Sequence, residues 1–308
     1  MRAVFMGTPA FAVPPLRALL EAGIDVVAAC TQPDRPSGRG NRMVPCHVKA
    51  LAVERGIPVL QFERIRRQEG VDALSVLAPD LFVTAAFGQI LSQRVLDIPR
   101  LGTVNVHASL LPKYRGPAPI NWCIIEGETV TGVTTMMTDA GIDTGDILLQ
   151  CEMEIDPEET AGELSERLSM LGAELLIETL CRIDAGDCPR MPQDHARATR
   201  HPMLSKELGH IDWMHPAARI ANLVRGVSPW PGAYAEMADG RMLKIWKAHA
   251  VDGDGVPGRA LCADAKRGLT VACGDGALAV TELQAPGARR MAATDYLRGH
   301  PLALKEIL

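Results

Sequence analysis

The chain has 308 residues, of which 47% are hydrophobic and 22% charged, and its formal net charge at pH 7 is -5. This composition is typical of a soluble globular protein, and the length suffices for two domains. The acidic balance argues against a protein that coats nucleic acid uniformly, so any contact with nucleic acid must be local.

The N-terminal residues are apolar, but Gly7, Pro9, Pro14 and Pro15 interrupt them. No apolar run approaches the ~20 residues that a membrane span needs, so we expect no membrane anchor. The eight cysteines include no CxxC pair, which fits free thiols in a reducing compartment. These features predict a cytoplasmic protein.

Short apolar strands alternate with helices over the first half of the chain. Residues 2–7 and 25–31 are typical of buried strands, and residues 14–23 between them of a helix, which together make a βαβ unit. The alternation continues with helices expected at 46–56 and 70–78 and strands expected at 57–61, 80–88 and 102–107. The pattern predicts an α/β fold with a Rossmann-like, mostly parallel sheet and helices on both faces.

The next two expected strands, 132–137 and 146–155, are separated by a short turn and are predicted to extend the sheet in the antiparallel sense. A long helix with strong 3.6-residue periodicity follows at 160–183. Thr160 followed by Glu163 predicts a capping box at its start.

The composition changes near Gly186, where prolines and charges replace the apolar periodicity. We therefore expect a first domain at 1–188, a linker at 189–206 and a second domain at 207–308. The second domain combines one helix, 215–227, with several short strands, which predicts a small OB-like β-barrel.

The strand at 102–107 carries an unusual pair of polar residues. Val104 and Val106 lie on one face, and Asn105 and His107 lie on the other, near the carboxyl end where open parallel sheets bind ligands. A Gly-rich turn downstream contains three aspartates, Asp139, Asp143 and Asp146. One of these carboxylates in reach of His107 would orient the ring and favour its charged form, while the Asn105 amide donates a hydrogen bond. Together they would form an oxyanion hole.

Each residue alone also has an ordinary structural interpretation. A single histidine at a strand end is commonly a hydrogen-bonded surface residue, and aspartates in Gly-rich turns commonly form Asx-turns. The aspartate spacing does not match a Ca²⁺ loop, and the cysteines have no zinc spacing, so no metal is expected. Neither G-x-G-x-x-G nor G-x-x-x-x-G-K-[ST] occurs, which argues against nicotinamide and ATP-loop sites.

Several motifs together carry a family resemblance. "MGTPAFAVPPL", "TQPDRPSGRG", "FGQIL", "NVHASLLPKYRGPAPI", "DAGIDTGDIL" and "GVSPWPGAY" occur in this order. The chain resembles the 10-formyltetrahydrofolate-dependent formyltransferases, and among them the methionyl-tRNA formyltransferases, over essentially its whole length. The resemblance implies transfer of a formyl group from 10-formyltetrahydrofolate to the α-amine of initiator methionyl-tRNA for translation initiation, by a monomer.

The resemblance also implies residue roles, which follow from the motifs. It assigns catalysis to Asn105, His107 and Asp143. It assigns folate binding to Ser109, Leu110, Leu111, Pro112, Phe87, Gly88, Ile90, Leu91 and Asp139. It assigns tRNA binding to Arg35, Arg39, Arg42, Lys206, Lys244 and Lys247.

Two other functions remain open at the level of the sequence. A formyltransferase acting on a small amine, such as an amino sugar nucleotide or glycinamide ribonucleotide, would use the same catalytic trio but would have less need of the arginine-rich loop at 31–45. A catalytically silent tRNA-binding module would keep basic residues without the trio. The ordinary interpretation of that loop is a solvated surface segment.

Overall fold

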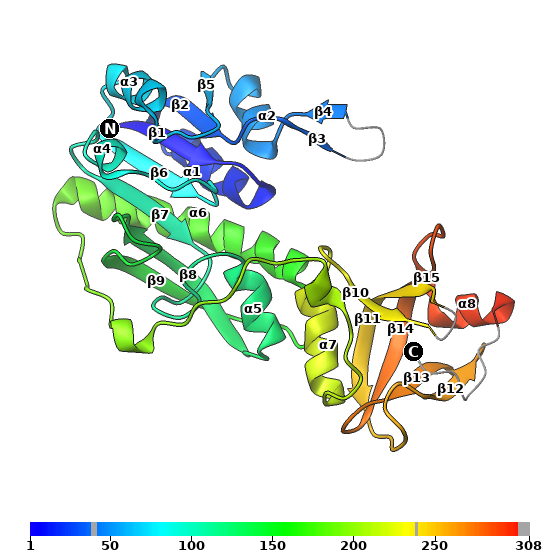
Figure 1. Ribbon diagram of the computed structural model, residues 1–308. Helices are drawn as coiled ribbons and strands as arrows, with labels where there is room; N and C mark the ends of the chain where they lie inside the picture. Colours follow the sequence, from blue (N-terminus) through cyan, green and yellow to red (C-terminus); the bar gives the residue numbers. More distant parts are fainter. Residues whose placement is uncertain (38–41, 238–239, 301–308) are drawn as a thin grey trace. The chain divides into compact units, whose positions relative to one another are not determined.

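Figure 1 shows the computed structural model of the chain, which describes residues 1–37, 42–237 and 240–300. The chain forms two compact units. The first comprises Met1–Gly116, Thr131–Met153 and Ser165–Arg200, and the second comprises Pro117–Val130, Glu154–Leu164 and His201–Leu308. Among the described residues, no helix combines the length and the apolar character that a membrane crossing needs.

The first unit is built on a seven-stranded sheet. Its strand order is β5 (Val59–Gln61), β2 (Asp25–Thr31), β1 (Arg2–Gly7), β6 (Leu81–Ala85), β7 (Thr103–His107), β8 (Val130–Met137) and β9 (Ile147–Glu154). The pairs from β5 to β7 are parallel, and β8 joins β7 in the antiparallel sense, as the sequence predicted.

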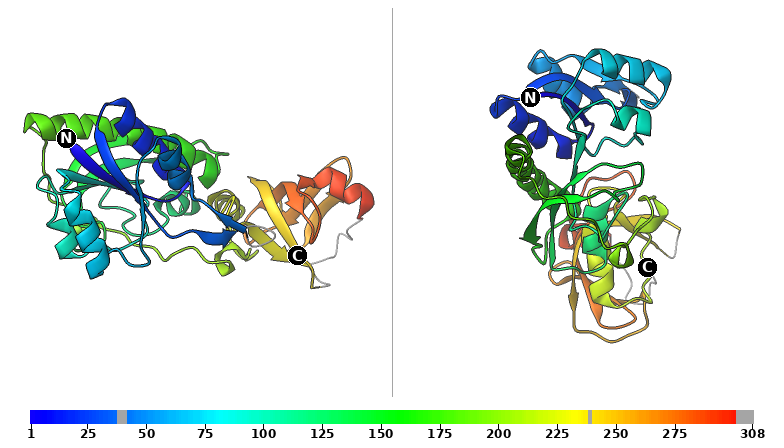
Figure 2. Two further views of the ribbon diagram at one scale, coloured as in Figure 1. Left: turned by 90° about the horizontal axis from the view of Figure 1, so that it is seen from above. Right: turned by 90° about the vertical axis from the view of Figure 1, so that its left-hand side faces the viewer.

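Helices cover both faces of this sheet (Figure 2). They are α1 (Val13–Glu21), α2 (His47–Glu54), α3 (Gln68–Val76), α4 (Gln93–Leu96) and α6 (Ala161–Ala185), with the 3-10 turn η1 (Ala10–Ala12) before α1. Leu74 of α3 and Val95 of α4 pack in one buried cluster with Met6 and Phe82 of the sheet. These findings confirm the predicted fold class of the first part of the chain.

The long helix α6 packs on the sheet face opposite α3 and α4. A Cβ atom at Gly172 would lie 2.8 Å from Val106 Cγ1, so the helix approaches β7 closely at this point. At its start, Glu163 accepts a hydrogen bond from Thr160 N at 2.9 Å and Thr160 Oγ1 accepts one from Glu163 N at 3.3 Å. The predicted capping box is therefore confirmed.

The second unit is rich in β-structure. Its sheet runs β10 (Ala233–Glu236), β11 (Met242–Val251), β14 (Ala277–Gln284), β13 (Gly268–Ala272) and β12 (Ala260–Asp264), with β15 (Met291–Ala292) paired to β14. The unit also contains α5 (Pro119–Ile125), α7 (Ala217–Gly226), α8 (Ala293–Gly299) and the 3-10 turn η3 (Glu207–Gly209). Ile220 and Val224 of α7 and Tyr296 of α8 bury against Leu243 and Leu278, so this unit has its own core.

The predicted domain limits at 188 and 206 stay a prediction, but the structure adds two findings about them. The residues Ser165–Arg200 group with the first unit, so much of the expected linker packs there. That segment contains the 3-10 turn η2 (His195–Arg197), and Met191 exchanges backbone hydrogen bonds with Ile147. Helix α5 groups with the second unit although it precedes β8 in the chain.

Candidate functional site

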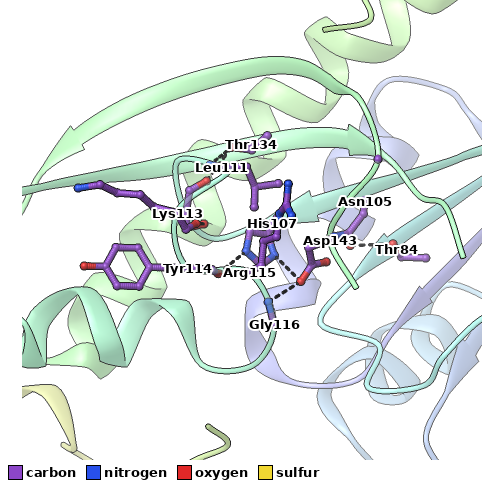
Figure 3. Close-up of polar contacts among 12 residues, drawn as sticks. Thr84, Asn105, His107, Leu111, Lys113, Tyr114, Arg115, Gly116, Thr134 and Asp143 are labelled. Carbon is purple, nitrogen blue, oxygen red and sulfur yellow. Dashed lines mark hydrogen bonds and ion pairs between the residues drawn. The ribbon is translucent and has the colours of Figure 1, made fainter. Parts of the chain in front are cut away.

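The site begins with Asn105 of β7, a strand that lies between β6 and β8. The parallel register places Thr84 opposite Asn105, and Thr84 Oγ1 donates a hydrogen bond to Asn105 Oδ1 at 2.7 Å (Figure 3). Thr84 is buried. With its carbonyl oxygen held in this way, Asn105 offers its Nδ2 donor to a ligand.

His107 lies on the same face of β7 and is only 7% exposed. Its Nε2 is 3.0 Å from the backbone oxygen of Tyr114. Because a carbonyl only accepts, Nε2 carries a hydrogen. Its Nδ1 lies 3.7 Å from Asp143 Oδ2, within ion-pair range but too far for a hydrogen bond. The ring therefore has a hydrogen-bond acceptor at Nε2 and a carboxylate within ion-pair distance of Nδ1.

Asp143 reaches His107 from the loop between β8 and β9. Its φ of 51° lies in the left-handed region, which aspartate tolerates better than most residues. Gly116 N donates to Asp143 Oδ2 at 2.8 Å, which fixes the carboxylate beside the imidazole (Figure 3). The side chain remains 20% exposed, so water can reach it.

The other two aspartates of this loop act differently. The Asp139 carboxylate accepts hydrogen bonds from Gly141 N and Thr144 Oγ1, at 3.0 and 2.7 Å, and so forms a turn within the loop itself. The backbone oxygen of Asp146 accepts from Met137 N at 2.9 Å at the base of the loop. The ordinary Asx-turn interpretation thus holds for Asp139, while Asp143 points to the histidine.

The loop after β7, which carries Ser109, Leu110, Leu111 and Pro112, is fastened by its neighbours in the sheet. Thr134 Oγ1 accepts from Leu111 N at 3.1 Å and donates to the Ser109 oxygen at 2.7 Å. Gln150 Nε2 donates to the Leu111 oxygen at 2.9 Å. The Leu111–Pro112 peptide bond is cis. The loop is therefore a fixed wall beside His107.

A second loop, which follows β6, contains four of the residues that the resemblance assigns to folate. The side chains of Phe87 and Leu91 are buried in the cluster with α3 and α4. The Phe87 oxygen accepts from Gln32 Nε2 at 3.1 Å, and Gly88 has a φ of 78°. Ile90 is 61% exposed. Because β6 and β7 are parallel neighbours, this loop and Asn105 lie at the same edge of the sheet.

Two of the predicted tRNA-binding residues, Arg35 and Arg42, lie on a short hairpin of the first unit, which consists of β3 (Arg35–Ser37) and β4 (Arg42–Val44). Arg35 Nη2 pairs with Glu63 Oε2 at 3.0 Å, and both side chains are about two-thirds exposed. Arg42 begins β4, and Arg39 lies outside the described residues.

Polar contacts anchor the base of this hairpin. Asp34 accepts hydrogen bonds from Lys49 and from Gln61 Nε2, the latter at 3.0 Å. These two hydrogen bonds, with Lys49 the larger contributor, lower the pKa of the Asp34 carboxyl. The chain just before Arg35 is therefore held to α2 and β5.

The predicted basic residues of the second unit are Lys206, Lys244 and Lys247. Lys206 precedes η3 and is exposed, as is Lys247 on β11. Lys244 Nζ lies 5.4 Å from the ring centre of Trp246, and Arg290 Cζ lies at the same distance. Cation–π contacts of this kind hold the two positive charges beside the indole.

Sequence reasoning missed five side chains that hold the site: Thr84, Thr134, Gln150, Arg115 and Gln193. Thr84, Thr134, Gln150 and Gln193 contact the site across strands or from a distant loop, so no local pattern marks them. Arg115 lies within the motif "NVHASLLPKYRGPAPI", which carries no predicted role for it. The part of the chain that the structure describes contains no cluster of three or more His, Cys, Asp or Glu side chains that could hold a metal ion.

Comparison with known families agrees with this geometry. Residues 1–180 match the family described as "Formyl transferase", and residues 203–301 match "Formyl transferase, C-terminal domain". This chain belongs to the formyltransferase family. The methionyl-tRNA formyltransferase of Geotalea uraniireducens is 52% identical over 308 residues, which cover 100% of this chain and 98% of that protein. That of Geobacter metallireducens is 53% identical over 296 residues, covering 96% and 94%.

Solved structures share the fold at lower identity. The sugar 3N-formyl transferase WlaRD aligns with a TM-score of 0.68 at 18% identity, covering 94% of this formyltransferase and 99% of that chain. HypX from Aquifex aeolicus, solved with tetrahydrofolic acid, aligns with a TM-score of 0.63 at 19% identity. That alignment covers 96% of this formyltransferase but only 47% of HypX, so the chain spans about half of HypX.

We expect Thr134→Val to destabilise the first unit and to loosen the loop after β7. The change leaves the buried Leu111 N and Ser109 oxygen without their partner, which typically costs about 1–3 kcal/mol per group. Urea unfolding and site-resolved hydrogen exchange check this. Leu111 N should exchange much faster, while the control Thr135→Val, whose hydroxyl contacts Thr179 on the other sheet face, should leave it protected. If the Leu111 amide exchanged at the same rate in both variants, the role assigned to Thr134 in holding this loop would be contradicted.

Proposed function

We propose that this protein transfers the formyl group of 10-formyltetrahydrofolate to the α-amine of initiator methionyl-tRNA, giving formylmethionyl-tRNA and tetrahydrofolate. The observation that carries the proposal is the placement of Asn105, His107 and Asp143 around one point at the carboxyl end of β7 (Figure 3). The identity of about 50% to methionyl-tRNA formyltransferases over the whole chain supports the choice of substrate.

The proposed chemistry begins with the neutral amine attacking the formyl carbon, on whose oxygen negative charge develops. Asn105 Nδ2 donates a hydrogen bond to that oxygen, and the His107 imidazolium stabilises the charge. A carbon–nitrogen bond to the amine forms as the bond to folate N10 breaks. The proton that the amine loses passes to N10 through a water held by Asp143.

Two loops are suited to hold the folate. The fastened loop of Ser109, Leu110, Leu111 and Pro112 supplies one wall, and the loop of Phe87, Gly88, Ile90 and Leu91 supplies the other. Exposed Ile90 offers an apolar surface, whereas Phe87 and Leu91 act by fixing the loop to the core. Asp139 acts through the turn that it forms beside Asp143.

The basic residues supply the contacts with tRNA. Arg35, Arg39 and Arg42 belong to an arm that meets the acceptor end, where phosphates and unpaired bases attract guanidinium groups. Lys206, Lys244 and Lys247 contribute backbone contacts from the second unit, in the region matched as the formyltransferase C-terminal domain. We assign catalysis to 1–188, tRNA binding to 207–308, and expect a cytoplasmic monomer.

The acceptor experiment tests the function directly. The full chain is supplied with 10-formyltetrahydrofolate and either methionyl-tRNA, an amino sugar nucleotide or glycinamide ribonucleotide, and kcat/KM is measured for each amine. We expect methionyl-tRNA to be preferred by at least about a thousandfold, since remote contacts with a large substrate position its amine. A small amine formylated more efficiently would replace the proposed substrate.

The catalytic trio is tested by substitution. We expect Asn105→Ala to lower kcat by about 100- to 1,000-fold, the usual effect of removing one oxyanion donor. Asp143→Asn should lower kcat at least as much, because it removes the charge beside His107 and the group that holds the water. The matched control is Asp146→Asn in the same loop, which should keep kcat within about threefold because its carboxylate has no assigned role. If Asp143→Asn retained half of the wild-type kcat, its role would be wrong.

The arginine arm is tested with Arg35→Ala. We expect a higher KM for methionyl-tRNA, unchanged folate binding and a salt dependence of kcat/KM that is shallower by about one ion, because one phosphate contact is lost. Glu63→Gln is the matched control: it removes the partner that neutralises Arg35 and should lower that KM or leave it unchanged. A higher KM in both variants would point to a structural role for the pair.

A further inference from the structure

Gln193 stands in the segment that the sequence predicts to be a linker, yet its side chain is buried and only 7% exposed. Both the nitrogen and the oxygen of its side-chain amide form hydrogen bonds. Nε2 donates to the backbone oxygens of Asp143 and Gly145, at 2.9 and 2.7 Å. Oε1 accepts from Arg115 Nε and Nη2, at 3.0 and 2.6 Å. One side chain thus joins the loop before β9 to the loop after β7.

Arg115 completes this connection. It is 3% exposed, and its Nη1 lies 3.1 Å from His195 Nδ1, which therefore accepts. Burial lowers the pKa of the Arg115 guanidinium, and the charges of Asp139 and Asp143 act in the opposite direction. Its backbone N donates to the Thr199 oxygen at 2.9 Å. The segment from Gln193 to Thr199 therefore contacts both loops that face the His107 ring, the loop of Asp143 and the loop of Tyr114.

Each of these two loops contains a residue other than glycine whose backbone is in the left-handed region. Asp143 and Tyr114 have φ angles of 51° and 59°, a region that costs free energy for residues other than glycine. Tyr114 N donates to Thr199 Oγ1 at 2.8 Å, and the Tyr114 oxygen receives the His107 ring hydrogen. Strained conformations persist where surrounding contacts over-determine them, and Gln193 supplies two such contacts to this loop, one at Asp143 and one at Gly145.

We infer that Gln193, together with Arg115, is a positioning residue of the formyl-transfer reaction, which holds the Asp143 loop so that the carboxylate stays beside His107. The inference rests on the proposed function and extends it to a segment that no motif marked. Gln193 does not touch the reacting atoms; it acts through Asp143.

A double-mutant cycle tests this dependence. Gln193→Met keeps the length of the side chain and removes both hydrogen-bonding ends, and should lower kcat by about 10- to 100-fold with KM for folate and tRNA little changed. In an Asp143→Asn background the same change should lower kcat by less than about threefold, because the group it positions is already lost. If the kcat losses of Gln193→Met and Asp143→Asn multiplied in full in the double variant, the inference would be overturned.

Gln61→Met is the matched control. Gln61 is also a bridging glutamine of the first unit, with hydrogen bonds to Thr31, Asp34 and Lys49. Gln61→Met and Asp143→Asn should act independently. The loss of kcat in their double variant should therefore equal the product of the two single losses, whatever the size of the Gln61→Met effect. Should Gln193→Met fail to fold, Gln193→Glu retains the acceptor for Arg115 while losing both donors, and the same coupling is expected.

A measurement without substrate separates this inference from the function. The amide of Gly116 donates to Asp143 Oδ2, so its NMR signal reports where the carboxylate lies. Gln193→Met should move this signal towards its position in Asp143→Ala, and Gln61→Met should not. If the signal moves as expected while methionyl-tRNA gains no formyl group, the holding role stands and the proposed function is wrong. An unmoved signal in an active enzyme overturns the holding role alone.

Discussion

The alternation of side chains along β7 is the constraint on which the site depends. Val104 and Val106 are fully or nearly fully buried, and α6 approaches Val106 so closely that a Cβ at position 172 would press against its methyl group. Because strand side chains alternate, this packing forces Asn105 and His107 to the opposite face. A slip of one residue would exchange the two sets, so the hydrophobic core fixes which groups face the ligand.

Main-chain groups set the orientation of the His107 and Asp143 side chains. The imidazole of His107 donates to a backbone oxygen, and the carboxylate of Asp143 accepts from a backbone N–H. Both partners belong to the turn after β7, whose residues Tyr114 and Gly116 have positive φ angles. The positive φ is costly at Tyr114, whose N–H donates to Thr199 Oγ1, while Thr134 of β8 and Gln150 of β9 hold the earlier part of the same loop. The site is therefore preorganised by hydrogen bonds that themselves take no part in the chemistry.

The two units differ in architecture and in the side chains that they present. The first places a small polar site at the end of a parallel sheet, as open α/β folds commonly do. The second builds its own core from α7, α8 and the antiparallel sheet, and carries cations held beside Trp246. Under the proposed function, these cations would supply contacts remote from the reacting amine, and the binding energy of such contacts would orient that amine.

The sequence by itself determined whatever depends on neighbouring residues: the strands and helices, the capping box of α6, the common face of Asn105 and His107, and the loop that carries Asp143. These follow from periodicity and motifs because side-chain direction is fixed within a few residues. The tertiary structure alone decided that Thr84 lies opposite Asn105, since that contact needs the order and register of β6 and β7. It also decided that Gln193 meets Arg115, 78 residues away, and that an expected linker is partly a buried support. Contacts between distant segments depend on how the whole chain packs, and no local pattern encodes them.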